Sequence, residues 1–188
     1  MTTLLMTAPD GVTGLAIGDL APPVQGLLGT DGLRHGVPEP APGSAVVVVF
    51  SSNRCPTAKA YDARMAELVR DFAPRGVEVI AINSNDPHLH PDESFARMQE
   101  RAAEGGFPFP YVVDAGQAVA RAFGATCTFH VFVLDGDRRV RYEGRFDDSR
   151  LPERVTTHDL RNALEDVLAG RPVRRAITRP FGCSLELL

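Results

Sequence analysis

Cys55 stands where a thiol can act as a nucleophile. Four valines and a phenylalanine, Val46 to Phe50, precede it and predict a strand that is buried on both faces. Ser51 to Arg54 form a polar turn, and Pro56 suits the first position of a helix because that position needs no amide hydrogen. Apolar residues then follow at helical spacing, at Tyr61, Met65, Leu68, Val69 and Phe72. Unpaired amides and the helix dipole at such a corner favour a thiolate, so we expect Cys55 to be nucleophilic.

The cysteine count and the chain's first residues bear on where this thiol would work. Three cysteines, an odd number, do not suit a secreted disulfide framework. The first ten residues lack the basic start and apolar run of a secretory signal, and no segment approaches the roughly 18 apolar residues of a membrane span. We therefore expect a cytoplasmic protein that does not engage a membrane.

Composition favours one soluble domain. A chain of 188 residues, 44% hydrophobic and 23% charged, is long enough for a single sizeable core. A net charge of -4 argues against non-specific binding to nucleic acid, which needs a basic face.

The elements that would position Cys55 alternate between strands and helices. After the Cys55 helix, Val77 to Ile82 predicts a second buried strand, so strand, helix and strand form a parallel crossover. The remaining segments are an edge hairpin around Thr30 to Gly32, a helix from Pro91, a strand at 111–113, a helix at 117–123, a hairpin of 131–134 with 140–142, and a final helix. Thr156 and Asp159 have the spacing of a capping box for that last helix. The order predicts an α/β domain with a mixed central sheet and helices on both faces.

We assign residues 1–188 to this one domain. Residues 1–17 show no periodicity and are interpreted as a loose arm, and 171–188, which include Cys183, as a C-terminal extension.

Several motifs together are similar to those of the thioredoxin superfamily, and more narrowly to its peroxiredoxin-like group of alkyl hydroperoxide reductase and thiol-specific antioxidant proteins. They are Asn53-Arg54-Cys55-Pro56, Ala60-Tyr61, Ala81 to Asp86, Gly106 to Tyr111, Ala125 to His130, Asp147 to Arg150 and Gly182 to Ser184. The resemblance covers roughly residues 18–188 and implies a thioredoxin-like fold.

The chain departs from this pattern at three positions. Ala58 replaces the second cysteine of a Cys-x-x-Cys pair, so a dithiol at the corner is absent. Ser52, three residues before Cys55, only partly matches the peroxide-polarising pattern. Phe129 follows Cys127-Thr128 where the group has a cis-proline. A cis bond before a residue other than proline costs roughly 2.5 to 4 kcal/mol, so we predict a trans Thr128-Phe129 bond or a rebuilt loop.

The resemblance also suggests roles for individual residues. It places the loop of Cys127 beside the corner, so Cys127 is the expected resolving thiol for Cys55 and the two would form a reversible disulfide. The expected substrate groove consists of Asn53, Arg54, Pro56, Thr128 and Phe129.

Other interpretations of the remaining polar and thiol residues stay open. Cys183 is either a packing thiol that holds the tail or a redox thiol. Cys127-x-x-His130 has the ligand types of a metal site, but it lacks a second cysteine pair, so we predict neither a metal nor a cofactor. Asp147, Asp148 and Arg150 are interpreted as a salt-bridged turn.

Function follows from the resemblance and from Cys55. We expect a thiol-disulfide oxidoreductase or redox sensor whose partner is a thiol or disulfide, on a protein or a small molecule. The alternatives are a one-cysteine hydroperoxide reductase and a non-catalytic binding protein with the same fold. The sequence leaves the oligomeric state open.

Overall fold

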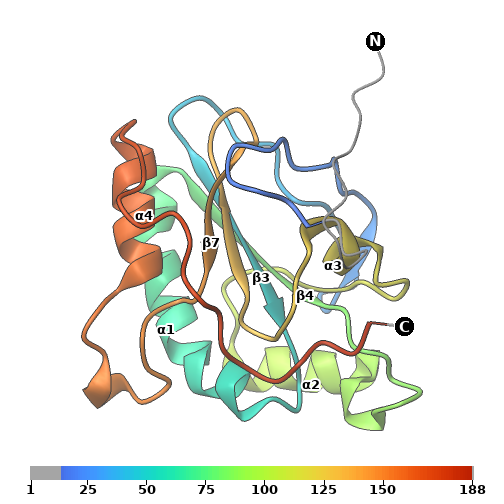
Figure 1. The fold of residues 1–188 in the computed structure, drawn as a ribbon. Helices are drawn as coiled ribbons and strands as arrows, with labels where there is room; N and C mark the ends of the chain where they lie inside the picture. The colour runs from blue at the N-terminus through green and yellow to red at the C-terminus, as the bar shows by residue number, and fades with distance from the viewer. Residues whose placement is uncertain (1–13, 188) are drawn as a thin grey trace.

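A single mixed sheet of seven strands organises the protein (Figure 1). The computed structural model describes residues 14–187. The strands are β1 (Leu27–Gly29), β2 (Arg34–His35), β3 (Ala45–Ser51), β4 (Val77–Asn83), β5 (Tyr111–Val113), β6 (Val131–Leu134) and β7 (Val140–Gly144). Across the sheet they run β2-β1-β5-β4-β3-β6-β7. β3 pairs in parallel with β4, and β4 with β5, whereas the other neighbours are antiparallel.

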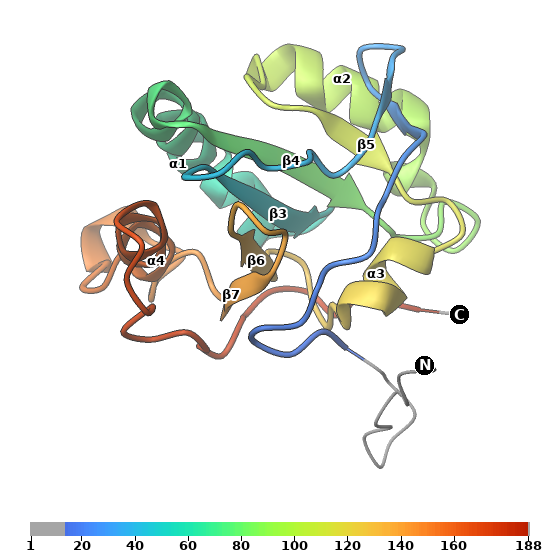
Figure 2. The same ribbon diagram turned by 90° about the horizontal axis from the view of Figure 1, so that it is seen from above.

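Helices cover both faces of the sheet, as predicted (Figure 2). They are α1 (Pro56–Phe72), α2 (Phe95–Gly105), α3 (Ala118–Phe123) and α4 (Asp159–Leu168), with single 3-10 turns at Ala73–Arg75, Pro91–Glu93 and Pro152–Arg154. Buried side chains of α1, α2 and α4 share one hydrophobic cluster, and those of α3 belong to the cluster on the opposite face. In residues 14–187 no helix is both long and apolar enough to span a membrane.

Strand β3 lies at the centre of both clusters. All seven of its residues are buried, which confirms the prediction made from the valine run. Because side chains alternate along a strand, Val47 and Val49 enter the cluster under α1, while Val48 and Phe50 enter the one under α3. The parallel pairing of β3 and β4 through α1 is also confirmed, and it places the ends of both strands at one edge of the sheet.

Two helix starts differ from the prediction. The segment from Pro91 first makes a 3-10 turn, and α2 begins only at Phe95. The capping box of Thr156 and Asp159 is wrong. His158 is the N-cap of α4, Thr156 hydrogen-bonds Asp148, and Arg145 holds the Asp159 carboxylate at 2.7 Å. Since both side chains have partners outside the helix, neither caps it.

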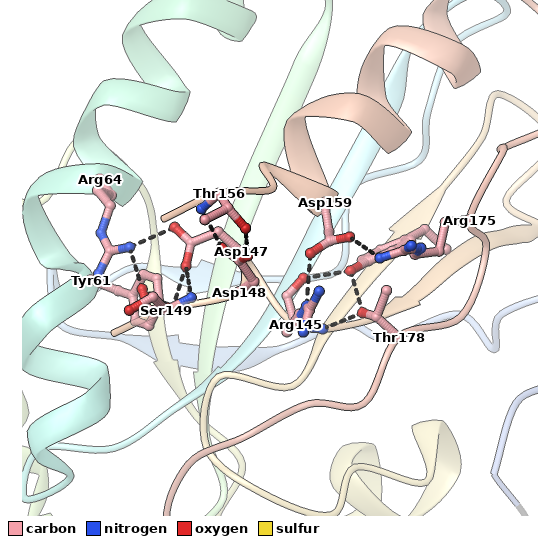
Figure 3. A network of polar contacts seen from close by, with 11 residues as sticks. Tyr61, Arg64, Arg145, Asp147, Asp148, Ser149, Thr156, Asp159, Arg175 and Thr178 are labelled. Carbon is pink, nitrogen blue, oxygen red and sulfur yellow. Dashed lines mark hydrogen bonds and ion pairs between the residues drawn. The ribbon is translucent and has the colours of Figure 1, made fainter. Parts of the chain in front are cut away.

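A buried ion pair fixes α1 to the loop that follows β7 (Figure 3). Asp147 accepts hydrogen bonds from the Tyr61 hydroxyl at 2.6 Å and from Arg64 at 2.5 Å. Arg64 also donates to the carbonyl oxygens of Ser149 and Arg150. The predicted salt-bridged turn is found only in part, because Asp147 pairs with Arg64 of α1 and Asp148 accepts hydrogen bonds from Thr156, while Arg150 forms no ion pair within residues 14–187.

Both ends of the described chain are held against the domain. Residues 1–13 of the expected arm lie outside the described residues, whereas the Leu15 amide donates to the Phe123 carbonyl at 3.2 Å. The C-terminal extension first follows β7, where the Glu143 amide donates to the Ala176 carbonyl and the Thr178 amide donates to the Glu143 carbonyl, and then passes the beginning of α1 (Figure 1). The extension therefore brings Cys183 to the Cys55 corner.

Candidate functional site

Cys55 occupies the predicted corner between β3 and α1. It is the N-cap residue of α1, with an extended backbone at φ -69° and ψ 118°, and Pro56 follows at the first helical position. Its carbonyl accepts the first helical hydrogen bond, from Lys59, at 3.1 Å. The residue is only 1% exposed, so other parts of the protein cover its sulfur at the start of α1.

The Thr128 hydroxyl donates a hydrogen bond to the Cys55 sulfur at 2.9 Å. Cys183, through its thiol and its amide, and the Ala58 amide also favour the charged form of this thiol. Burial by itself raises the pKa of the Cys55 thiol, because it disfavours the charged form. The Cys183 thiol, the Thr128 hydroxyl and the two amides together outweigh burial and lower that pKa to about 7. Cys55 is therefore substantially ionised at neutral pH.

The other two cysteines have pKa values shifted in the opposite direction. Burial raises the pKa of Cys127 and outweighs the lowering by the Thr126 side chain, and the charge on Cys55 raises it further. Partial burial and donation to Cys55 raise the pKa of Cys183 to about 11. All three cysteines are free thiols, with Cys127 buried and Cys183 exposed. The site thus has one thiolate beside two protonated thiols.

The loop that carries Thr128 is rebuilt around Phe129. No peptide bond in the described residues is cis, which confirms the predicted trans bond before Phe129. Phe129 instead adopts a left-handed backbone with φ 60°, which is rare for a bulky side chain. Its amide donates to the Phe50 carbonyl at 2.6 Å, and its ring stacks on Tyr61 with centroids 4.6 Å apart. Phe129 therefore lies in the core and not in a substrate groove.

A buried carboxylate beneath the corner was missed by sequence reasoning. Glu93, 2% exposed, accepts hydrogen bonds from the Ser52 hydroxyl, the Asn53 amide at 2.8 Å and the Asn83 side chain at 2.9 Å. Ser52 in turn accepts a hydrogen bond from the Cys55 amide at 3.1 Å. An acidic residue after a proline in a polar loop gives no signal of burial, so only the fold reveals this network.

Asn53 supports the corner from the other side. Its side chain accepts from the Tyr111 hydroxyl at 2.9 Å and donates to the Asp92 carbonyl at 3.0 Å. Arg101 donates to the Ser52 carbonyl at 2.6 Å. These contacts tie the turn before Cys55 to β5 and α2, so Asn53 has a positioning role.

A small cavity of about 220 Å³ opens at the corner, lined by the residues on either side of Cys55 in the sequence but not by Cys55 itself. Of the predicted groove residues, Arg54, Pro56 and Thr128 line it, together with Cys183 from the C-terminal extension. The structure therefore gathers three of the five predicted groove residues at one opening.

His130 is a core residue. It is 6% exposed, its ring lies 4.5 Å from that of Phe132, and its Nδ1 accepts a hydrogen bond from the Thr126 amide at 3.3 Å. Burial lowers its pKa to about 4, so the ring is neutral at pH 7. Within residues 14–187, no three or more His, Cys, Asp or Glu side chains are grouped to hold a metal ion. The geometry offers no support for the Cys127-x-x-His130 metal hypothesis.

Comparison with known proteins identifies the relatives of this chain. The family model described as Redoxin matches residues 16–164. A thiol-disulfide oxidoreductase ResA from Halalkalibacterium halodurans is 32% identical over 82 residues, which span 44% of this chain and 43% of that protein. A hypothetical protein of Sinorhizobium meliloti 1021 has a solved structure that is 36% identical, with a TM-score of 0.84 over 93% of this chain and 96% of that one.

A more distant structure shows the fold. The thioredoxin domain of a thiol-disulfide oxidoreductase from Bacteroides vulgatus is 15% identical and covers 69% of this chain and 89% of its own, with a TM-score of 0.57. The predicted thioredoxin-like fold is thereby confirmed.

Proposed function

The chain belongs to the Redoxin family, and from that premise we propose that it is a thiol-disulfide oxidoreductase whose nucleophile is Cys55. A redox function on a thioredoxin fold is what the family and the ResA relative support. The use of Cys55, and a partner that carries a thiol or a disulfide, are the finer parts of the proposal.

One observation carries the choice of Cys55. The Thr128 hydroxyl lies 2.9 Å from its sulfur at the start of α1, and Cys183 and this hydroxyl lower its pKa to about 7. Thiol-disulfide exchange proceeds through the thiolate, and it is fastest for a thiol whose pKa lies near the ambient pH.

The reaction follows from this ionisation. The Cys55 thiolate attacks one sulfur of a partner disulfide and forms a mixed disulfide. The partner's second sulfur leaves as a thiolate and takes a proton from water. One partner sulfur is thereby reduced to a thiol. Cys55 and the other partner sulfur remain joined in the mixed disulfide until a second thiol attacks it and releases the partner.

A hydroperoxide reductase is less well supported by the geometry. A peroxide needs a free hydroxyl to polarise it, and the Ser52 hydroxyl donates to Glu93. The cytoplasmic location and the Cys55-Cys127 disulfide remain predictions.

Single-turnover rates distinguish the candidate functions. The protein would be mixed at pH 7 with oxidised glutathione or with hydrogen peroxide, quenched with acid and analysed by intact mass. Oxidoreductase function predicts that Cys55 reacts with the disulfide several-fold to roughly tenfold faster than an unperturbed thiol of pKa about 8.5, since about half of it is ionised. Cys55→Ser should abolish this fast phase.

The two alternatives give other outcomes. Faster reaction with peroxide than with disulfide, leaving a sulfenic acid, would point to a peroxidase. Slow reaction with both would point to a binding protein and would end the enzyme proposal.

A further inference from the structure

The C-terminal tail, defined here as residues 181–187, lies along the loop at 126–128 beside Cys55. Thr128 donates its amide to the Cys183 carbonyl at 2.8 Å, and Leu185 donates its amide to the Thr126 carbonyl at 3.2 Å. Cys127 and Ser184 form an isolated antiparallel bridge. The tail is thus paired through its backbone with the loop that supports the thiolate.

Side chains on either side of Cys183 anchor the tail to different parts of the core. Phe181 packs against the cluster under α1, with its ring 6.5 Å from that of Tyr61. Leu185 is 9% exposed and belongs to the cluster on the opposite face. Two anchors, one before and one after Cys183, hold its thiol over the corner.

The residue before Cys183 must be small. A Cβ atom at Gly182 would stand 2.0 Å from the carbonyl oxygen of Thr128, which is too close for any real contact. Gly182 therefore lets the tail approach the loop closely enough for the Cys183 amide to reach the Thr128 hydroxyl at 3.0 Å. The same hydroxyl lies 2.9 Å from the Cys55 sulfur.

We propose that Cys183 is the resolving thiol of Cys55, and that the tail delivers it as an internal second thiol. This inference rests on the proposed function and names the group that completes it. The first exchange leaves Cys55 joined to one sulfur of the partner. The Cys183 thiolate then attacks the Cys55 sulfur, the bond to the partner breaks, and the partner leaves as a thiol. A Cys55-Cys183 disulfide remains, and an external dithiol reduces it to restore both thiols.

The electrostatics give the two thiols a defined order. While Cys55 is a thiolate, its charge and its hydrogen bond raise the pKa of Cys183 and keep that thiol protonated. Once Cys55 is in a neutral mixed disulfide, both effects end, whereas the nearby Arg54 continues to lower the pKa of Cys183. Cys183 therefore becomes a better nucleophile only after Cys55 has reacted.

Contacts favour Cys183 over Cys127 in this role. The Cys183 amide donates to the Thr128 hydroxyl, and that same hydroxyl lies 2.9 Å from the Cys55 sulfur. Cys183 also lines the cavity at this corner, through which a partner would approach, whereas Cys127 is not among the lining residues. The resolving role that family resemblance suggests for Cys127 is the competing outcome of the test.

The experiment uses Ellman's reagent, an aromatic disulfide that releases a coloured thiol, on the full chain at pH 7. Attack by Cys55 releases the first thiol and resolution releases the second, so the wild-type protein should release two thiols rapidly per equivalent of reagent. Intact mass and peptide mapping should then find a Cys55-Cys183 disulfide. Cys183→Ser should release one thiol and retain the aromatic adduct on Cys55, with resolution at least roughly tenfold slower, whereas Cys127→Ser should behave like the wild type.

Two results would overturn the inference while leaving the proposed function in place. They are a rapid first release followed by a persistent wild-type adduct, and resolution in Cys183→Ser that is as fast as in the wild type. If the first release is also slow, and Cys55→Ser does not change it, the proposed function fails together with the inference.

Discussion

The hydroxyl of Thr128 lies 2.9 Å from the sulfur of Cys55, although 73 positions separate the two residues. The same oxygen accepts a hydrogen bond from the Cys183 amide at 3.0 Å. Thr128 thus joins three segments of the chain: the corner after β3, the loop before β6 and the C-terminal tail. The ionisation of Cys55 depends on this junction.

Removing the Thr128 hydroxyl should raise the pKa of Cys55. A hydrogen bond to a charged group contributes about 1.5 to 3 kcal/mol, and one pKa unit corresponds to about 1.4 kcal/mol. Thr128→Val should therefore move the pKa upward by roughly one unit and slow alkylation of Cys55 by iodoacetamide at pH 7 several-fold. Above pH 9 the two proteins should react at similar rates, because Cys55 is then ionised in both. Equal rates at pH 7 would exclude this role for Thr128.

Loosening the tail should speed the attack of Cys55 on a disulfide and slow the resolution of the mixed disulfide by Cys183. Leu185→Ala removes a buried anchor, and truncation of a buried leucine costs about 2 to 5 kcal/mol when the residue is fully packed. Cys55 is only 1% exposed in the wild-type protein, so a looser tail should let it react faster with Ellman's reagent. The comparison is made at pH 9, where Cys55 is ionised in both proteins. Release of the second thiol should become slower, because Cys183 is less often in place.

Ile177→Ala provides the control for this prediction. Ile177 also belongs to the C-terminal extension but is 61% exposed, so its truncation should change neither step. If Leu185→Ala slows both steps equally, the tail does not cover Cys55.

The buried carboxylate of Glu93 should contribute strongly to stability. Glu93→Ala would leave the Asn53 amide, the Asn83 side chain and the Ser52 hydroxyl without their acceptor. Each buried donor without an acceptor costs about 1 to 3 kcal/mol, so the free energy of unfolding in urea should fall by about 3 kcal/mol or more. Glu93→Gln keeps one carbonyl acceptor and should cost less than half as much. A negligible loss in Glu93→Gln, whose side chain has nearly the shape of glutamate, would show that the loss in Glu93→Ala comes from packing and not from hydrogen bonding.

Phe129 offers a test of backbone strain. Its φ of 60° suits glycine better than any residue with a Cβ atom. Both Phe129→Ala and Phe129→Gly lose the ring that stacks on Tyr61, so both should destabilise the fold. The glycine variant should nevertheless be about as stable as the alanine variant or up to about 1 kcal/mol more stable, the reverse of the order in a helix or strand. Urea unfolding of the two variants in parallel measures this difference, and a clear advantage for alanine would contradict the strained conformation.

The elements around Cys55 were predictable because their signals are local. The valine run of β3, Pro56 at the first position of α1 and the apolar spacing of that helix each act within a few residues. The parallel pairing of β3 with β4 followed from the helix between them. The cysteine at the corner could therefore be anticipated from the sequence, and of the helix-start amides expected there the Ala58 amide does lower its pKa.

The groups that tune Cys55 could not be predicted, because they come from distant segments. Glu93 follows a proline in a polar loop, and nothing local indicates that three donors bury its carboxylate. Cys183 lies in a segment without periodicity, and its place beside Cys55 depends on the two anchors and on Gly182. Phe129 was expected to line the substrate groove, but its ring stacks on Tyr61 in the core. The left-handed backbone at Phe129, which directs the ring there, has no local signal in the sequence.

Titration of the Cys55 thiolate shows whether this thiol is activated at neutral pH. Absorbance at 240 nm would be followed from pH 4 to pH 10 for the wild-type protein, and the curve for Cys55→Ser would be subtracted. We expect a difference curve with a midpoint at a pH of about 7, because Cys183 and Thr128 outweigh the effect of burial on the sulfur. A midpoint at or above about 8.5, where an unperturbed thiol titrates, would contradict the assignment of Cys55 as an activated nucleophile.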